Sequence, residues 1–167
     1  MSADIYLGLG ANLGDPLATF NRALTHLEAF TELISVSRIY RSAPFGFSDQ
    51  PPFKNAAVRI SSELTPLSLL KKLQEIEKSL GKKIIRENGP RIIDLDVLLY
   101  DEISIKNEDL TIPHPRILER DFVLRPLLDL NPKISHPSWS PKTAKSALSR
   151  LREKFIEGEP ETWVLPS

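Results

Sequence analysis

The chain of 167 residues has the length of a single domain, since domains most often contain about 100–150 residues. Hydrophobic residues make up 41% of it and charged residues 26%, which is typical of soluble globular proteins. The 22 basic and 22 acidic residues cancel and cysteine is absent. This composition excludes disulfides and thiolate metal sites, and it argues against a strongly charged surface for nucleic acids or anionic membranes.

The apolar runs are far shorter than the roughly 20 residues that span a bilayer. The N-terminal segment also lacks a basic region followed by a long apolar stretch, so it does not resemble a signal peptide. We therefore expect a cytoplasmic protein that binds neither membranes nor nucleic acids.

The first part of the chain predicts three strands and one helix. Alternating apolar residues predict a strand at residues 5–9. An Asp-Pro pair is typical of a helix start, and apolar residues at spacings of three and four predict a helix at residues 16–30. Residues 33–40 and 53–61 are rich in β-forming residues and predict two further strands, with a proline-rich loop between them.

A second helix and a fourth strand follow. A Thr-Pro pair predicts a helix at residues 66–80, which Gly81 would end. Residues 92–100 are apolar almost throughout, so we expect a central strand that is buried on both faces. The remaining predicted elements are three short apolar segments, a surface helix and a closing edge strand, at residues 103–105, 110–112, 122–130, 143–154 and 163–165.

The order strand–helix–strand–strand–helix–strand predicts an α+β fold. It is typical of the ferredoxin-like βαββαβ arrangement, in which helices pack on the faces of a mainly antiparallel sheet. We expect residues 1–167 to form one domain.

Asp94 and Asp96 are the strongest candidates for chemistry. Residues two apart in a strand share a face, so both carboxylates would project side by side while Leu95 faces the core. The two charges repel each other unless a cation lies between them, and oxygen ligands on a rigid strand suit Mg²⁺ that substrate phosphates also hold. The alternative is a solvated strand face, which the apolar character of this strand disfavours.

Positive side chains precede this pair. Arg91 adjoins it, and Lys82, Lys83 and Arg86 lie in the irregular segment before it. Cations beside a metal pair suit phosphoryl transfer, because charge spreads over the phosphate oxygens in the transition state. For Lys83 and Arg86 the alternative is an exposed charged turn.

A second cluster contains His114, Arg120 and Phe122. Prolines on both sides of His114 restrict its backbone, so the imidazole is held in place to donate a hydrogen bond to a phosphate oxygen. The alternative is a structural histidine that is satisfied within the fold.

Other polar residues lie where apolar ones are expected. Glu77 lies on or beside the apolar stripe of its helix, with Gln74 one turn earlier, and both could hydrogen-bond a nucleotide. The alternative for Glu77 is an ion pair with a nearby lysine. Phe53 and Asn55 share a strand face, where a ring can stack on a heterocycle and an amide can bind its polar edge; the alternative for Phe53 is a core position.

Several motifs are absent. The chain has no Walker-type phosphate loop, no nucleophile elbow and no His-Glu-x-x-His, and its N-terminal glycines miss the spacing of a dinucleotide-binding loop. A protein of this sequence that binds nucleotide phosphates therefore does so with metals and basic side chains.

The sequence resembles the 6-hydroxymethyl-7,8-dihydropterin pyrophosphokinases, a family of folate-pathway enzymes. The resemblance covers roughly residues 4–135 and is carried by Tyr6-Leu-Gly-Leu-Gly-Ala-Asn-Leu-Gly14, Asp49-Gln-Pro-Pro-Phe-Lys-Asn-Ala56, Gly89-Pro-Arg-Ile-Ile-Asp-Leu-Asp96 and Ile112-Pro-His-Pro-Arg-Ile-Leu-Glu-Arg-Asp-Phe-Val123. It implies a ferredoxin-like fold and a transferase that moves pyrophosphate from ATP to the hydroxymethyl group of the dihydropterin, releasing AMP. Sister folate enzymes are often fused to such domains, so the resemblance leaves open whether this chain is part of a longer polypeptide.

The resemblance also implies roles for individual residues. Asp94 and Asp96 would hold two Mg²⁺ ions against ATP, with Lys82 and Arg91 as further catalytic residues. The implied ATP-binding positions are Gln74, Glu77, Arg91, Val97, Leu110, Thr111, His114 and Arg120. The implied pterin-binding positions are Ala43, Pro44, Phe45, Phe53, Asn55, Asp94 and Phe122.

The chain departs from the family pattern in the loop after Gly81. Lys82 stands where the family usually has an arginine, and Ile84 occupies a position that is often cationic. Lysine keeps the charge but loses the two-pronged guanidinium, so the roles of Lys82, Lys83 and Arg86 stay open.

Two other functions fit parts of the pattern. A polymerase-like nucleotidyltransferase also uses Asp-x-Asp on a strand, but it needs an upstream Gly-Ser pair, which this chain lacks. An RNA-binding ferredoxin-like sheet would need exposed strand aromatics and a basic surface, which the balanced charge does not favour.

Overall fold

The chain forms an antiparallel sheet with helices on both faces. The structure is a computed structural model and describes residues 1–44, 48–83 and 89–166. Its strands are β1 (Ala3–Ala11), β2 (Glu32–Val36), β3 (Tyr40–Ser42), β4 (Phe53–Ser62), β5 (Asp94–Tyr100), β6 (Ile105–Lys106) and β7 (Thr111–Ile112). Its helices are α1 (Pro16–Leu27), α2 (Pro66–Ser79), the 3₁₀ helix η1 (Ile117–Glu119), α3 (Asp121–Leu130) and α4 (Ala144–Arg150).

The main sheet has the strand order β2-β4-β1-β5, and β3 pairs with β4 beyond the end of β2. Every pair is antiparallel. Helix α1 connects β1 to β2 with β4 between them, and α2 connects β4 to β5 with β1 between them, which is a split βαβ connection. The predicted α+β class and the predicted order of strands and helices are therefore confirmed.

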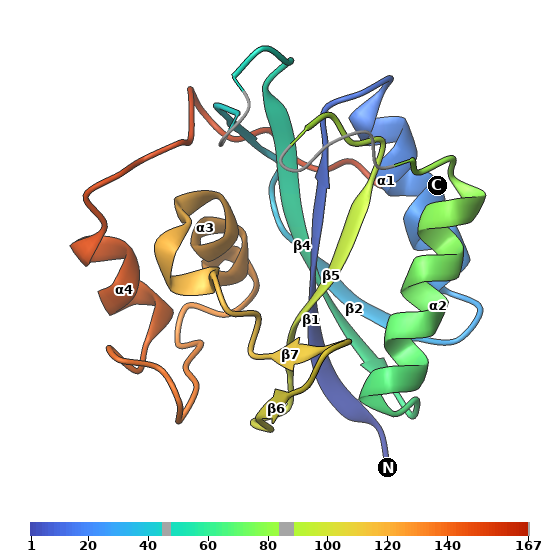
Figure 1. The fold of residues 1–167 in the computed structure, drawn as a ribbon, viewed down its shortest axis with the longest axis vertical. Helices are drawn as coiled ribbons and strands as arrows, with labels where there is room; N and C mark the ends of the chain where they lie inside the picture. The colour runs from blue at the N-terminus through green and yellow to red at the C-terminus, as the bar shows by residue number, and fades with distance from the viewer. Residues whose placement is uncertain (45–47, 84–88, 167) are drawn as a thin grey trace.

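The helices form a layer on each side of the sheet (Figure 1). On one side, α1 and α2 cover a core that includes Leu7, Phe20 and Leu73. On the other side, α3 and α4 cover a second core that includes Leu124 and Ala147. Both faces of the described sheet are thus largely buried.

The starts of the two long helices follow directly from the sequence. The Asp15 carboxylate accepts a hydrogen bond from the Ala18 N–H at 3.2 Å, and the Thr65 hydroxyl accepts one from the Ser68 N–H at 3.3 Å. In both helices a proline fills the first position, where no N–H donor is needed. Gly81 has a φ of +95° after α2, a conformation that favours glycine, as predicted.

The prediction that residues 92–100 form a central strand is wrong. The strand begins at Asp94, and among the described strands it pairs with β1 alone, so β5 is an edge strand. Its apolar residues are buried because helices cover both faces. Its open edge is partly covered too: the Leu95 N–H donates to the Glu77 carboxylate at 2.8 Å, and the His114 N–H donates to the Leu98 carbonyl at 3.0 Å.

The prediction of one strand at residues 33–40 is also wrong, because the segment forms β2 and β3 with a break between them. The break lies at Ser37, whose hydroxyl accepts the Ala57 N–H at 2.8 Å in place of a backbone carbonyl. The next residue, Arg38, turns outward to form an ion pair with Asp129 at 2.8 Å.

The C-terminal part differs most from prediction. The predicted strand at residues 163–165 is absent; instead the indole of buried Trp163 packs on Phe20 and donates to the Asn21 side chain at 2.8 Å. The helix predicted at residues 143–154 is the shorter α4, and residues 122–130, expected only as an apolar segment, belong to α3.

Candidate active site

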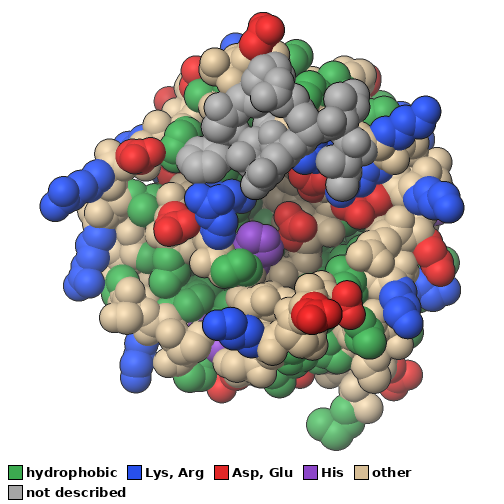
Figure 2. All heavy atoms as spheres, in the orientation of Figure 1, with side chains coloured by type: hydrophobic (Ala, Val, Ile, Leu, Met, Phe, Trp, Pro, Cys, Tyr) green, Lys and Arg blue, Asp and Glu red, His purple; other side chains and the backbone are tan. Residues whose placement is uncertain are grey.

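A pocket lies between the sheet and α3, close to the ends of β1, β4 and β5. Figure 2 shows acidic, basic and histidine side chains gathered around a hollow on this side of the molecule. The residues that line the pocket come from the sheet, α3 and the adjoining loops: Gly8, Leu9, Gly10, Ser42, Ala43, Phe53, Asn55, Ala56, Ala57, Gly89, Arg91, Asp94, Asp96, Leu98, His114, Arg120, Phe122 and Val123.

Two glycines of β1 keep the floor of the pocket open. Gly8 lies opposite Asp96 and Gly10 lies opposite Asp94 in the β1–β5 register. A Cβ atom at Gly8 would come within 3.3 Å of the Leu98 side chain, which leaves no room for a larger residue without movement. Sequence reasoning missed this role, although the glycines alternate with Leu7 and Leu9 and so share one strand face.

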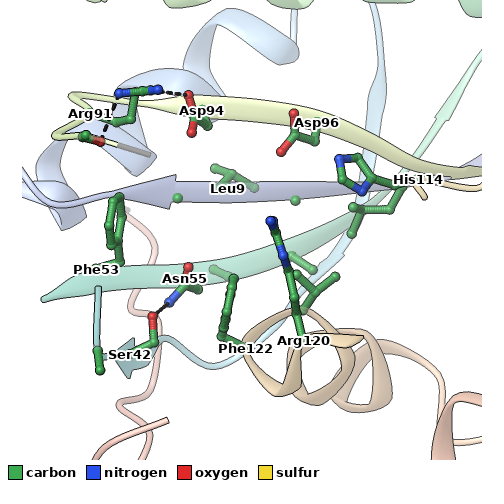
Figure 3. Close-up of a pocket in the computed structure, with 18 residues that line it drawn as sticks. Leu9, Ser42, Phe53, Asn55, Arg91, Asp94, Asp96, His114, Arg120 and Phe122 are labelled. Carbon is green, nitrogen blue, oxygen red and sulfur yellow. Dashed lines mark hydrogen bonds and ion pairs between the residues drawn. The ribbon is translucent and has the colours of Figure 1, made fainter. Parts of the chain in front are cut away.

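Asp94 and Asp96 both line this pocket, and their carboxylates lie side by side on β5 (Figure 3). This is the geometry that strand periodicity predicts. Asp96 is accessible to solvent within the pocket, yet protein surrounds its carboxylate. Loss of solvation, followed by repulsion from Asp94 and Glu77, raises the pKa of Asp96 to about 7.

Lys82 forms ion pairs with two acidic side chains, Asp94 at the pocket and Glu77 on α2. Its ammonium lies 2.8 Å from Asp94 Oδ1 and 3.0 Å from Glu77 Oε2. Burial lowers the pKa of Lys82, but the hydrogen bonds and charges of Asp94 and Glu77 outweigh this effect and leave it raised. Burial raises the pKa of Glu77, against the hydrogen bonds from Leu95 and Lys82. Glu77 thus has both the lysine partner that its position required and a backbone donor from β5.

Arg91 lies on the opposite side of Asp94. Its Nε is 3.7 Å from Asp94 Oδ1, and its NH1 donates to the carbonyls of Gly89 and Pro90 at 2.8 and 3.1 Å. Its guanidinium is thereby held at the pocket by its own loop (Figure 3). Lys83 is exposed, and Ile84 and Arg86 lie outside the described residues.

Asn12 is a buried polar residue that sequence reasoning missed. Its Oδ1 accepts the Arg91 N–H at 2.8 Å, and its Nδ2 donates to Gln50 Oε1 at 2.8 Å and to the Pro51 carbonyl at 2.9 Å. Asn12 therefore joins the end of β1 to both loops at the mouth of the pocket. The sequence shows only an asparagine just after a predicted strand, and the partners of its side chain are distant in sequence.

His114 and Arg120 both line the pocket: Arg120 reaches in from the start of α3, and His114 lies beside Asp96, with its backbone against β5 (Figure 3). Burial and the neighbouring charges of Arg120 and Arg116 lower the pKa of His114 to about 4, so the imidazole is neutral near pH 7. Burial also lowers the pKa of Arg120, with Arg116 adding to the effect. The His114 imidazole and the Arg120 guanidinium are thus two hydrogen-bond donors in the same pocket as the carboxylate pair.

The remaining wall is aromatic and amide in character. Phe53, Asn55 and Phe122 line it together with Ala43. The buried Asn55 amide donates to Ser42 Oγ at 2.8 Å and to the Tyr40 carbonyl at 3.2 Å, which fixes its orientation. Phe122 lies under the Arg120 guanidinium, 5.6 Å from the ring centroid. Pro44 follows Ala43 in the chain, and the predicted Phe45 lies outside the described residues.

The other predicted nucleotide-binding residues do not line this pocket. Gln74 is exposed on α2, and Val97 is part of the core. Leu110 and Thr111 lie just before and at the start of β7. Helix α2 and strand β7 both contact β5, so these residues lie on or next to β5 and its neighbouring elements, but outside the pocket lining.

The donor set of the pocket fits a magnesium ion that also binds substrate. No group of three or more His, Asp or Glu residues in the described ranges is placed to hold a metal ion by itself. Asp94 and Asp96 supply two carboxylates on one face, and Mg²⁺ is commonly bound by one or two carboxylates together with phosphate oxygens. Burial, and after it repulsion from Asp94 and Glu77, raises the pKa of Asp96, and a bound cation would offset that repulsion.

Fold and site together define an α+β protein whose pocket places cationic side chains and paired carboxylates beside an aromatic wall. A sequence model of the family described as 7,8-dihydro-6-hydroxymethylpterin-pyrophosphokinase (HPPK) matches residues 6–132. The chain belongs to this family, whose members are pyrophosphokinases.

Individual relatives agree with this assignment. The chain is 40% identical over 137 residues to an Aquifex aeolicus 2-amino-4-hydroxy-6-hydroxymethyldihydropteridine pyrophosphokinase, covering 82% of this chain and 86% of the relative. It is 38% identical over 151 residues to the Bacillus subtilis protein of the same name, covering 89% and 90%. It is similar to a crystal structure of Plasmodium falciparum HPPK-DHPS with a TM-score of 0.74 and 16% identity, covering 90% of this chain and 43% of that one.

Some relatives are much longer than this chain. A folic acid synthesis protein of Dictyostelium discoideum is 39% identical over 145 residues, covering 87% of this chain but only 22% of its own length. Domains of this kind thus occur both nearly alone and within long folate-synthesis proteins. Among the described residues, no helix has the length and apolar character needed to cross a membrane.

Proposed function

We propose that this chain transfers the β,γ-pyrophosphoryl group of ATP to the hydroxymethyl oxygen of 6-hydroxymethyl-7,8-dihydropterin and releases AMP, in folate biosynthesis. Family membership supports the reaction. The observation that carries the assignment to this site is the pair Asp94 and Asp96, which faces one pocket between a cationic side and an aromatic side.

The pterin occupies the side lined by Phe53, Asn55 and Phe122. The two rings offer flat apolar surfaces for stacking, and the fixed Asn55 amide offers a polar group to the edge of the heterocycle. Ala43, Pro44 and Phe45 complete this part of the proposed pterin site.

The triphosphate lies between the carboxylate pair and the cations. Arg91, His114 and Arg120 line the pocket, and each can donate to phosphate oxygens, His114 as a neutral imidazole. Lys82 is the further proposed catalytic residue: its ion pair with Asp94 holds one of the two carboxylates in place. These residues bind and orient the reacting groups for in-line attack by the pterin hydroxyl.

Asp94 and Asp96 would hold two Mg²⁺ ions, which neutralise charge on the triphosphate when bound. The nucleoside would bind beside β5, at the proposed positions Gln74, Glu77, Val97, Leu110 and Thr111, which lie on α2, on β5 and at or just before β7. The proposal includes a single domain at residues 1–167, a cytoplasmic location and association with other folate enzymes, as in the longer relatives.

Product analysis tests this function directly. The purified chain, ATP, Mg²⁺ and the dihydropterin are incubated together, and nucleotides and pterins are separated by chromatography. We expect AMP and the pterin diphosphate in equal amounts, and no AMP when the pterin is omitted. Formation of ADP, or AMP formation that does not depend on the pterin, would contradict the proposal.

The same assay separates the nearest alternative. A nucleotidyltransferase would attach AMP to its acceptor and release pyrophosphate. Free pyrophosphate and the adenylylated pterin, a phosphodiester of the pterin hydroxymethyl group and AMP, would then accumulate instead of free AMP. A matched variant, Asp109→Asn, changes an exposed carboxylate away from the pocket and should leave the product yield unchanged.

A further inference from the structure

The C-terminal segment at residues 155–157 lies between two walls of the pocket, and it lies outside the residues 6–132 that define the family match. We propose that Phe155 is a positioning residue for pterin binding: together with the backbone of this segment, it holds Phe122 and Ala43 at the separation that the pterin ring needs. This inference rests on the proposed function.

On one side the segment is fixed to the start of α3. The Asp121 carboxylate is buried, with 4% of the residue exposed. It accepts the Phe155 N–H at 3.2 and 3.0 Å through its two oxygens, and the Ile156 N–H at 3.1 Å. Hydrogen bonds to an ionised carboxylate are stronger than neutral ones, and the N-terminal position of Asp121 in α3 favours its negative charge.

On the other side the segment is fixed to β3 and the residue after it. The Ala43 N–H donates to the Phe155 carbonyl at 2.8 Å, and Ser42 and Ile156 form a β-bridge. The Glu157 N–H donates to the Arg41 carbonyl at 2.8 Å. Two consecutive residues, Phe155 and Ile156, therefore contact α3 and the β3 strand at the same time.

The Phe155 side chain extends this connection to the ring expected to stack on the pterin. The Phe155 and Phe122 rings meet edge to face, with centroids 6.0 Å apart and an interplanar angle of 84°. The Arg120 guanidinium lies 5.6 Å from the centroid of the Phe122 ring. Phe122 is thus held by both neighbours, while Phe155 itself does not line the pocket.

This arrangement predicts an effect on the pterin and not on the nucleotide. The contacts of Phe155 reach Phe122 and Ala43, whereas the carboxylate pair and Arg91 are held by β5 and its preceding loop. Arg120 also contacts the Phe122 ring, but hydrogen bonds between its backbone and Ile117 and Leu124 hold it independently of Phe155. Loss of the Phe155 ring should therefore loosen the pterin wall and leave the proposed phosphate-binding side chains in place.

The test measures binding of 6-hydroxymethylpterin and of α,β-methylene-ATP by calorimetry in the wild type and in Phe155→Ala. The pterin Kd should rise roughly three- to tenfold, the range that one aromatic pair gives, while the Kd of the ATP analogue stays unchanged. Turnover at saturating pterin should stay within about twofold of the wild type. Phe155→Tyr keeps the ring and should restore pterin affinity, and Glu159→Ala, an exposed change in the same segment, should bind like the wild type.

Equal pterin affinity in Phe155→Ala and the wild type would overturn the inference. An equal loss of affinity for the pterin and for the ATP analogue would overturn it too. If Phe155→Ala does not fold, Asp121→Asn, which weakens the hold on the same segment, must show the same pterin-selective loss. A wild-type protein that binds no pterin would instead overturn the proposed function, so the two failures are distinguishable.

Discussion

The central residues of the site, Asp94 and Asp96, could be predicted to lie side by side because the side chains of a strand alternate between its faces. The same reasoning indicated that Glu77 needed a partner, and the structure provides Lys82 and the Leu95 N–H. Asn12 could not be predicted in its role, since its partner Arg91 lies 79 residues away in sequence. Local sequence patterns therefore predict the direction of a side chain but not its distant hydrogen-bond partners.

Lys82 is expected to stabilise the folded protein as well as to serve the reaction. In Lys82→Met, the Glu77 and Asp94 carboxylates lose their shared cation. The free energy of unfolding should fall by about 2 kcal/mol, less than for a fully buried pair because Asp94 is partly exposed. Denaturant titration measures the loss, and Lys82→Arg should recover most of it. Unchanged stability in Lys82→Met would show that the ammonium does not hold these carboxylates.

His114 predicts a dependence of stability on pH. Its pKa is about 4 in the folded protein, below its ordinary value of 6.5, so the unfolded chain binds more protons between these pH values. The contribution of His114 to the free energy of unfolding should therefore be intact above pH 6.5 and should fall as the pH drops towards 4, by roughly 2–3 kcal/mol in all. The difference between wild type and His114→Asn, followed by denaturant titration across this range, measures it. A difference that is constant with pH would contradict the lowered pKa.

At the scale of elements, the starts of α1 and α2 were more predictable than the positions of the strands in the sheet. Asp15 and Thr65 cap their helices as their sequence neighbours indicate. By contrast, the apolar residues of β5 indicate that both faces of the strand are buried, but they do not indicate its position in the sheet. In the structure β5 is an edge strand, and Glu77 and His114 bind part of the backbone along its outer edge.

Asn12 is expected to link β1 to the two loops at the pocket mouth. In Asn12→Ala the Arg91 N–H loses its acceptor, and the contacts to Gln50 and Pro51 are lost. We expect a loss of about 2 kcal/mol in the free energy of unfolding and a reduced kcat, because Arg91 is no longer fixed. The matched change Asn107→Ala removes side-chain hydrogen bonds in an exposed turn and should leave kcat unchanged. Wild-type turnover in Asn12→Ala would contradict this linking role.

At the scale of the whole molecule, one sheet supports two cores. The core under α1 and α2 and the core under α3 and α4 share β1, β4 and β5, so neither can form without the strands of the other. Composition and element order predicted this α+β class. The C-terminal region was less predictable, because its contacts with β3 and α3 join segments that are far apart in sequence.

The shared sheet predicts that the chain unfolds as one unit. Calorimetry should show a single transition in which the calorimetric and van't Hoff enthalpies agree, as expected of a cooperative domain. Two separate transitions, or early loss of the α3–α4 side alone, would contradict the single-domain proposal.

The most direct test of the central claim is to measure divalent-cation binding by the carboxylate pair. Mn²⁺ serves as a spectroscopic probe, and α,β-methylene-ATP supplies a triphosphate whose α,β bridge cannot be cleaved. We predict that the wild type and the exposed control Asp109→Asn bind Mn²⁺ tightly in the presence of the analogue, whereas Asp96→Asn loses at least about tenfold in Mn²⁺ affinity. With ATP in place of the analogue, the rate of AMP formation in Asp96→Asn should fall by about 10²–10³-fold. Wild-type Mn²⁺ binding and AMP formation in Asp96→Asn would contradict the account.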